Sequence, residues 1–295
     1  MTADPDVLLL MGDIGYKVFD RIAELAPRQL LNMGVAEANM IGTCAGLALS
    51  GKKPFAYTII PFLTMRAFEQ IRVDIAIQKQ SVKLVGVGGG LAYGNQGPTH
   101  HSLEDVAILR AVPNMIIIVP CDPIESRKAT RAAYEYDGPV YIRLGRNGEP
   151  KLHPEDYSFS IGKAAQMRPG SDATIVSSGP VTKIALDAAE VLAQQGIQAR
   201  VLNVHTIKPF DTEAVVKAAH ETRAMISVEE HNIIGGLGSA VSEALAESRA
   251  NVPFKRFGIR DTICYGVGSQ EYHLKRNGVT VDSISQTIVQ LLDTR

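Results

Sequence analysis

The sequence predicts an α/β protein built from two doubly wound domains with mainly parallel sheets. Three observations support this fold class: short apolar runs alternate with amphipathic stretches, the runs are flanked by Gly or Pro, and a polar stretch separates two alternating blocks. We place the domains at residues 1–150 and 165–295, joined by a linker at 151–164. A chain of 295 residues is long enough to form two hydrophobic cores.

The first block is expected to contain five buried strands, because short apolar runs between turn residues fit parallel strands that are covered on both faces. These runs are 7–12, 53–60, 82–89, 115–120 and 140–145. Helical patterns lie between them at 36–50, 64–79, 102–111 and 123–136. Ser102, which precedes Glu104 and Asp105, is the expected N-cap of the third helix.

The second block repeats the alternation of strands and helices. Its expected strands are 173–179, 199–207, 224–231 and 252–259, and its expected helices are 182–196, 212–222, 238–248 and 283–292. This order again predicts a parallel sheet with crossover helices.

Composition excludes several classes of partner. The net charge is −1, which gives no reason to expect nucleic acid or an anionic membrane surface as a ligand. No apolar run approaches the ~20 residues that span a bilayer. The three cysteines lie far apart and the N-terminus lacks the basic start of a signal peptide, so we expect a cytoplasmic protein.

Four segments are expected to lie at the carboxyl ends of strands, where open α/β sheets bind ligands. They are GDIG at 12–15, the segment around Glu37, the Gly-rich loop at 86–105 and RLGRNG at 143–148. The Gly-rich loop carries His100 and His101; glycine allows close approach of a ligand, and histidine suits proton transfer near neutral pH. An ordinary surface loop with two histidines explains the pattern equally well. The GVGGG stretch lacks the GxGxxG spacing of a dinucleotide site.

Glu37 is the single carboxylate in the small, apolar stretch LNMGVAEANMIGTCAGLAL at 31–49. A buried glutamate needs a partner or a proton. An acid stabilised by the N-terminus of a helix also fits the pattern. We expect its partner to lie outside this chain.

Two other patterns have ordinary structural explanations. Phe62, Met65 and Phe68 recur at helical spacing, which is typical of core packing. VEEHNIIGGLGS at 228–239 precedes a helix and fits a tight turn better than an anion site at the helix N-terminus.

Taken together, the ordered motifs resemble the thiamine-diphosphate enzymes of the transketolase group, whose relatives include deoxyxylulose-phosphate synthase and the β subunits of 2-oxo acid dehydrogenases. The resemblance spans nearly the whole chain. It rests on GDIG, NMGVAEANMIG, PFLTMRAFEQIRVDIA, GNQGPTHHSLED, PNMIIIVPCDP, IRLGR, HTIKPFD and VEEHNIIGGLGS. It implies a pyrimidine-binding domain at 1–150 followed by the C-terminal domain of the family.

The resemblance also implies a partner. The family's diphosphate-binding domain, in which a GDG motif and a later Asn hold Mg²⁺ and diphosphate, has no counterpart in this sequence. The resemblance therefore implies thiamine diphosphate as cofactor and Mg²⁺ bound by a separate N-terminal transketolase subunit. It also implies self-association, with two copies of each subunit forming an α2β2 assembly.

The resemblance implies roles for individual residues. The residue matched by Glu37 bonds to N1′ of the aminopyrimidine and activates the cofactor; this needs a carboxyl that can share a proton, which burial favours. His100 matches a histidine that meets the substrate oxygen. The cofactor-binding set is Asp13, Ile14, Val35, Glu37, Phe62, Met65 and Phe68, and the substrate-binding set is Lys17, Gln96, His100, His101 and Arg146.

Departures from the family pattern concern the substrate. Gln96 stands where typical transketolases have an Asp, Gly88 where they have a phosphate-contacting His, and Lys17 where they have a phosphate-binding Ser. Arg146 matches a phosphate-binding Arg that is retained. An anionic group on the substrate therefore still fits, while recognition of the sugar hydroxyls is altered.

The function implied by the resemblance is the C-terminal subunit of a two-subunit transketolase. It transfers a two-carbon ketol group from a ketose, phosphorylated or otherwise anionic, to an aldose; a modified ketose and another two-carbon or acyl donor both stay open as the donor. The main alternative is the β subunit of a 2-oxo acid or acetoin dehydrogenase. A non-catalytic partner subunit and a nicotinamide-binding oxidoreductase are the other hypotheses.

Overall fold

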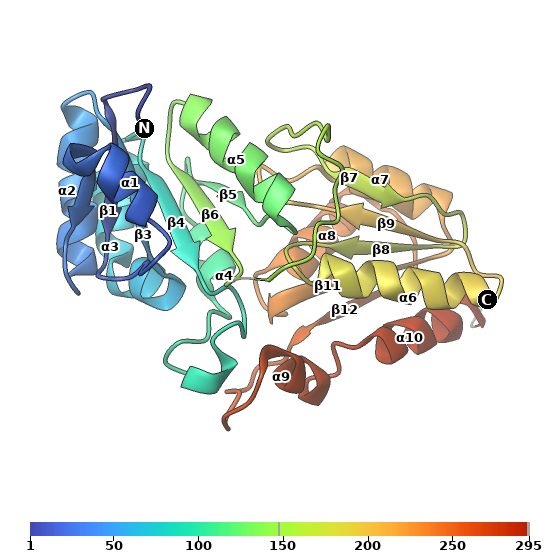
Figure 1. Ribbon diagram of the computed structural model, residues 1–295. Coiled ribbons are helices and arrows are strands. Elements are labelled where there is room, and N and C mark those ends of the chain that lie inside the picture. The colour runs from blue at the N-terminus through green and yellow to red at the C-terminus, as the bar shows by residue number, and fades with distance from the viewer. Residues whose placement is uncertain (147, 294–295) are drawn as a thin grey trace.

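The computed structural model describes residues 1–146 and 148–293 (Figure 1). Asn147 of the RLGRNG motif and residues 294–295 of the expected C-terminal domain lie outside the described residues. The described part forms two sheets with helices packed on them, which confirms the predicted α/β class.

The first sheet has seven strands in the order β10-β5-β6-β4-β3-β1-β2. Its strands are β1 (Val7–Met11), β2 (Leu30–Asn32), β3 (Lys53–Ile59), β4 (Lys83–Val87), β5 (Ile116–Ile118), β6 (Val140–Leu144) and β10 (Thr206–Lys208). All neighbours are parallel except β10, which runs antiparallel to β5. The carboxyl ends of the parallel strands therefore meet at one edge, as predicted.

Different helices cover the two faces of the first sheet. They are α1 (Asp20–Leu25), α2 (Glu37–Leu49), α3 (Phe68–Gln70), α4 (Asp105–Arg110) and α5 (Pro123–Glu135), with short 3₁₀ turns η1 (Pro27–Gln29) and η4 (Gly94–Gln96). The helix expected at 64–79 is largely of the π type, with segments η2 (Phe62–Arg66) and η3 (Ile71–Ile77) on either side of α3. α2 and the π segments pack on one face, and α5 packs on the other over β5 and β6.

The second sheet has five strands in the order β12-β11-β8-β9-β7. Its strands are β7 (Ala165–Arg168), β8 (Ala173–Ser177), β9 (Ala199–Asn203), β11 (Ala224–Asn232) and β12 (Phe254–Ile259). Its helices are α6 (Thr182–Gln194), α7 (Thr212–Glu221), α8 (Leu237–Ser248), α9 (Gln270–Arg276) and α10 (Val281–Asp293). Only β7, at the edge, is antiparallel to its neighbour.

A continuous apolar core joins the two sheets. Met40 and Ile41 of α2 belong to the same buried cluster as Met225 of β11 and Val241 of α8. Figure 1 shows the two sheets side by side with α8 behind them. Because this core is shared, the second sheet can fix the position of loops that leave the first.

Two expectations about local structure were wrong or incomplete, and four short elements were not predicted. Ser102 does not cap a helix, because its backbone pairs with Gly90 and α4 begins later, at Asp105. The strand expected at 199–207 is divided, because β10 leaves the second sheet to pair with β5 of the first. Helices α1 and α9 and strands β2 and β7 were not predicted; these elements have seven residues or fewer, and their sequences have little apolar periodicity.

No helix in the described part of the chain is both long enough and apolar enough to cross a lipid bilayer.

Candidate active site

The loops at the carboxyl edge of the first sheet are tied together by side-chain hydrogen bonds. Asn32, at the end of β2, donates from Nδ2 to Oδ1 of Asp13 in the GDIG turn at 2.8 Å. Its own Oδ1 accepts from the backbone N–H of Gly34 at 3.0 Å. The turn after β1 and the segment that leads into α2 therefore form one surface.

Glu37 is the first residue of α2, and its carboxyl is almost fully buried, with 1% of the residue exposed. The guanidinium of Arg66, from η2, donates from Nη1 to Oε2 of Glu37 at 2.6 Å. The expectation that the partner lies outside the chain was therefore wrong for the chain by itself. The side chain of Arg66 is 48% exposed, so the ion pair has one buried and one accessible member.

A series of ring contacts links this ion pair to the Gly-rich loop. The Arg66 guanidinium lies 4.7 Å from the ring centroid of Phe62. Phe62 meets His100 edge-on at 5.1 Å between centroids, and His100 in turn lies 6.2 Å from Tyr93. The Arg146 guanidinium lies 4.8 Å from the Tyr93 ring. Four predicted residues, Glu37, Phe62, His100 and Arg146, are thus brought into one chain of contacts.

Two residues of this chain of contacts, Arg66 and Tyr93, were missed by the sequence analysis. Arg66 lies in the PFLTMRAFEQIRVDIA motif, but nothing in the spacing separates it from an ordinary surface arginine. Its placement depends on the π-type turn over Phe62–Arg66, a local geometry that often occurs at functional sites. Burial raises the pKa of Tyr93, and the Arg146 charge partly opposes this effect.

Several other predicted residues border this surface. Met65 is 41% exposed and Val35 is 71% exposed. Gln96 is exposed in η4 within the Gly-rich loop. Lys17 is also exposed, in the turn after β1, and its ammonium lies 5.4 Å from the ring of Tyr16.

Three predicted residues take more interior positions. Ile14 packs beside the small apolar cluster around Tyr57. Phe68 packs against the main core. His101 is 5% exposed, with its ring centroid 5.4 Å from that of His273 in α9. Burial, aided by His273, lowers the pKa of His101. The structure therefore does not bring His101 to the surface that His100 shares with Phe62.

The VEEHNIIGGLGS segment forms a closed structural turn. The Glu229 carboxylate accepts from the backbone N–H groups of Leu237 at 2.6 Å and Gly238 at 2.8 Å, at the N-terminus of α8. Burial raises the pKa of Glu229 to about 7, although these two donors act in the opposite direction. An anion site at this helix end is therefore already filled by the chain itself, as the turn interpretation requires.

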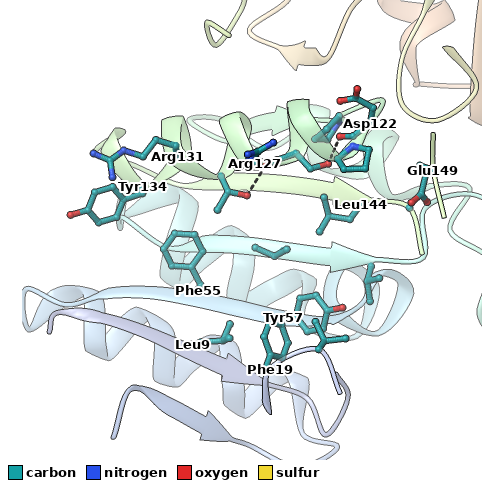
Figure 2. Close-up of a pocket in the computed structure, with 18 of the residues that line it drawn as sticks. Leu9, Phe19, Phe55, Tyr57, Asp122, Arg127, Arg131, Tyr134, Leu144 and Glu149 are labelled. Atoms are coloured by element: carbon teal, nitrogen blue, oxygen red, sulfur yellow. Dashed lines mark hydrogen bonds between the residues drawn. The ribbon is translucent and has the colours of Figure 1, made fainter. Parts of the chain in front are cut away.

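A cavity on the face of the first sheet covered by α5 meets these contacts only at Arg146, which is one of its lining residues. It has a volume of about 760 Å³ and is a groove between α5 and the N-terminal segment. Figure 2 shows Leu9, Phe55 and Tyr57 on its floor, with Arg131 and Tyr134 on the side of α5. Its floor is apolar, and neither Glu37 nor His100 lines it, so it shares only Arg146 with the predicted site.

One group of potential metal ligands occurs among the described residues: Cys121, Asp122 and His153. Both Asp122 oxygens are already occupied by backbone donors: Oδ1 accepts from Glu125, and Oδ2 accepts from Leu152 and His153. Burial raises the pKa of the Cys121 thiol far above its ordinary range. These groups therefore join α5 to the linker through hydrogen bonds, and they are poorly suited to bind a metal ion.

Comparison with known families decides the assignment. The profile described as "Transketolase, pyrimidine binding domain" matches residues 1–150, and the profile described as "Transketolase, C-terminal domain" matches residues 162–284. The chain belongs to the transketolase family. Its relatives add detail about the kind of subunit.

Two curated relatives are similar over most of their length. A 6-deoxy-6-sulfo-D-fructose transketolase subunit, SqwH, of Clostridium sp. (strain MSTE9) is 43% identical over 90% of this chain and 81% of the relative. An apulose-4-phosphate transketolase subunit of Phocaeicola vulgatus is 41% identical over 94% of this chain and 90% of the relative. This chain is accordingly a subunit of a transketolase-type enzyme, within a family that uses thiamine diphosphate. The dehydrogenase alternative is not favoured.

Solved structures agree with this assignment. A structure described as "Split gene transketolase, inactive beta4 tetramer" superposes with a TM-score of 0.88 at 37% identity, covering 99% of this chain and 93% of that one. Transketolase from Campylobacter jejuni superposes with a TM-score of 0.77 at 21% identity, covering 97% of this chain but only 44% of the other, and shows the shared fold. A split-subunit transketolase thus matches this chain end to end.

Proposed function

We propose that this chain supplies the aminopyrimidine side of a thiamine-diphosphate site, with the diphosphate and Mg²⁺ bound by a separate N-terminal subunit. The observation that carries the proposal is the buried Glu37 carboxyl at the N-terminus of α2, which pairs with the accessible Arg66, whose guanidinium lies over the ring of the half-buried Phe62. The sequence contains no GDG motif followed by the matching Asn. The split-gene relative is described as inactive in its β4 form, which supports the need for a second kind of chain.

The residues present fit the aminopyrimidine ring of the cofactor. Glu37 would hold a proton at N1′, and Phe62 and Met65 would flank the ring plane. Asp13, Ile14 and Val35 would border the thiazolium. Thiamine diphosphate, when bound, supplies the cleavage of the carbon–carbon bond beside the ketose carbonyl.

Arg66 has a role in this proposal that the sequence did not indicate. In the chain by itself it neutralises the Glu37 carboxylate, because a buried charge without a partner is costly. Its exposed guanidinium can withdraw when a ring nitrogen reaches the carboxyl. Arg66 would therefore compensate the charge of the buried carboxylate and keep the site folded before the cofactor binds.

The substrate would lie between His100 and Arg146. His100 would donate to or accept a proton from the substrate oxygen, within reach of the Phe62 and Tyr93 rings that fix its orientation. Arg146, held over Tyr93, and Lys17 would attract an anionic group at the far end. Gln96 would contact a sugar hydroxyl, and His101 would contribute only through the loop in which it is buried.

We propose an anionic, non-standard ketose as donor and an aldose as acceptor. Two relatives are named for a sulfonated and a phosphorylated sugar, both of which are anions. We further propose an α2β2 assembly located in the cytoplasm. The three cysteines, all free and buried, are compatible with a reducing compartment.

The test uses the complex recovered from native cells with a tagged copy of this chain. Ketol transfer is measured with pairs of ketose donors that differ only in the presence of a phosphate or sulfonate group. We expect transfer from the anionic donor, and a KM for that donor that rises about tenfold or more in Arg146→Ala. Lys217→Ala, which removes an exposed positive charge from α7, is the control. Equal use of both donors, or an unchanged KM in Arg146→Ala, contradicts this assignment.

A further inference from the structure

The Gly-rich loop that carries His100 is closed at its neck by a pair of backbone hydrogen bonds. The N–H of Gly90 donates to the carbonyl of Ser102 at 3.1 Å, and the N–H of Ser102 donates back at 2.8 Å. Residues 91–101 thus form a loop closed at one narrow point, between the end of β4 and the start of α4. In Figure 1 this loop extends from the end of β4 to the neighbourhood of α9.

A carboxylate from the second sheet holds the first side of this neck. Glu230 of β11 is 3% exposed, and its Oε1 accepts from the backbone N–H of Leu91 at 2.6 Å. Gln270 of α9 donates from Nε2 to both carboxylate oxygens, at 2.9 and 2.7 Å. A Cβ on Gly90 would lie 2.4 Å from Cγ of Glu230, and Gly90 has a φ of +65°. Glycine is required here because the carboxylate approaches the backbone so closely.

The second side of the neck is held through Arg143 and Asn232. Arg143 of β6 donates from Nη2 to the carbonyls of Ser102 at 2.7 Å and Glu230 at 3.0 Å, and from Nε to the carboxylate of Asp105 at 2.8 Å. The N–H of Asn232 donates to the carbonyl of Leu103 at 2.8 Å. The end of β11 is therefore hydrogen-bonded to the chain on both sides of the neck, at Leu91 and at Leu103.

The tip of the loop also rests on the second block. Nε2 of His273, in α9, lies 3.3 Å from the carbonyl oxygen of Gly94. The His273 ring also packs edge-on against the ring of His101. A Cβ on Gly94 would come within 2.8 Å of the carbonyl oxygen of Gly268. The loop is thus supported from one side by α9 and β11, while His100 on its other side faces Phe62.

We infer that Glu230 is a positioning residue for the transferase reaction: by fixing the neck at Leu91, it holds His100 against the cofactor-binding face. This inference rests on the proposed role of His100. It assigns a function to the second block, in which the sequence analysis placed no site residue. A small shift of a positioned group costs a large factor in rate, so loss of this contact should lower turnover.

The neighbouring residue Glu229 provides a matched control. It is a buried acid on the same strand and, like Glu230, accepts hydrogen bonds from the backbone. Its two N–H donors belong to α8 and not to the loop. Replacing Glu229 therefore removes a comparable buried contact without releasing the neck. Glu230→Gln is the rescue variant, because its amide oxygen can still accept from Leu91 and the Gln270 amide can turn to match it.

The first readout is amide hydrogen exchange of the full chain, which needs neither cofactor nor activity. We expect Glu230→Ala to speed exchange at 91–104 by about tenfold or more, with β4 unchanged, and Glu230→Gln to restore protection. Glu229→Ala should instead speed exchange in α8. If Glu230→Ala fails to fold, Gln270→Ala gives the milder test at the same contact. Unchanged exchange at 91–104 in the folded variants overturns the inference.

The second readout is kinetics in the complex with the native partner. We expect kcat to fall about tenfold or more in Glu230→Ala, to recover in Glu230→Gln and to stay near the wild-type value in Glu229→Ala. Faster loop exchange with an unchanged kcat also overturns the inference, because Glu230 would then have a structural role only. A wild-type complex without ketol transfer would refute the proposed function, whereas the exchange experiment tests the neck contact independently.

Discussion

Glu37 and Arg66 form an ion pair in which only one member is shielded from water. Glu37 is 1% exposed, whereas the side chain of Arg66 is 48% exposed. Removing the partner of a buried charge costs more than the pair itself contributes, because the remaining charge stays desolvated. This asymmetry makes the pair testable in the full chain, without cofactor or partner.

Arg66→Met is predicted to lower the free energy of unfolding by about 1–3 kcal/mol, because it leaves the Glu37 carboxylate buried and unpaired. The double variant Glu37→Gln/Arg66→Met should recover most of this loss, because a neutral amide needs no ionic partner. Urea denaturation of the four proteins in the cycle measures the coupling. Additive effects of the two substitutions would show that the pair is not coupled and would contradict the account of Arg66.

His100→Ala is predicted to lower kcat of the complex by about 10²–10⁴-fold, the range for loss of a general acid–base group. Affinity for thiamine diphosphate should change little, because His100 faces the substrate in this proposal. Steady-state kinetics and calorimetric titration of the cofactor separate the two effects. His220→Ala, in the last turn of α7, is the control. A variant that loses cofactor affinity while keeping its kcat would assign His100 to the cofactor instead.

At the scale of elements, the alternating pattern predicted the order of most strands and helices but not every partner. The run at 199–207 fits one buried strand, yet its end crosses to the other sheet as β10. Pairing between distant segments of this kind leaves no trace in local periodicity. Arg66 was missed for a related reason: its position depends on a π-type turn, which the spacing of apolar residues does not indicate.

Only those site residues that stand out in the local sequence could be predicted, and residues that depend on tertiary contacts could not. Glu37 stood out because it is a single acid in an apolar stretch, and the structure buries it as expected. His100 and His101 are adjacent in sequence, and only contacts with Phe62 on one side and His273 on the other separate their environments. The role of Glu230 required the tertiary contact with Leu91, which is 139 residues away in sequence.

Asp122 joins two elements through one carboxylate. Its Oδ1 caps α5 at Glu125, and its Oδ2 accepts from two linker N–H groups, Leu152 and His153, each at 2.7 Å. Asp122→Ala is predicted to lower the free energy of unfolding by about 2–4 kcal/mol, because a helix cap and two backbone partners are lost together. Ser269→Ala, which removes only the cap of α9, should cost about 1 kcal/mol. Equal losses measured by thermal or urea unfolding would show that the linker contacts contribute nothing.

At the scale of the whole molecule, the contact between the two blocks contains buried ionisable groups whose pKa values move in opposite directions. Burial raises the pKa of Glu230 from 4.5 to about 7, and the negative charge of Glu149 adds to this increase. The Leu91 N–H, the Arg143 charge and the Gln270 amide lower the pKa and only partly offset the effect of burial. Burial lowers the pKa of His231 from 6.5 to about 4. The stability of the junction should therefore depend on pH in a way that a single substitution can isolate.

The sign follows from proton binding. Between pH 4.5 and about 7 the folded chain keeps a proton on Glu230 that the unfolded chain releases, so this contribution to stability falls as pH rises through that window. Glu230→Gln removes the titration. When the pH is raised from about 5 to about 8, the free energy of unfolding of the wild type should therefore fall by about 2 kcal/mol more than that of the variant. Parallel curves of unfolding free energy against pH would contradict the raised pKa of Glu230 in the folded chain.

The central claim is that this chain holds only half of a thiamine-diphosphate site. The most direct test is calorimetric titration of thiamine diphosphate with Mg²⁺ into the chain by itself and into the complex recovered with its native partner. We predict no measurable binding by the chain alone and saturable binding by the complex, in which Glu37→Ala weakens the affinity. Tight binding by the chain alone would contradict the two-subunit account, because the diphosphate and Mg²⁺ would then be bound by residues of this chain.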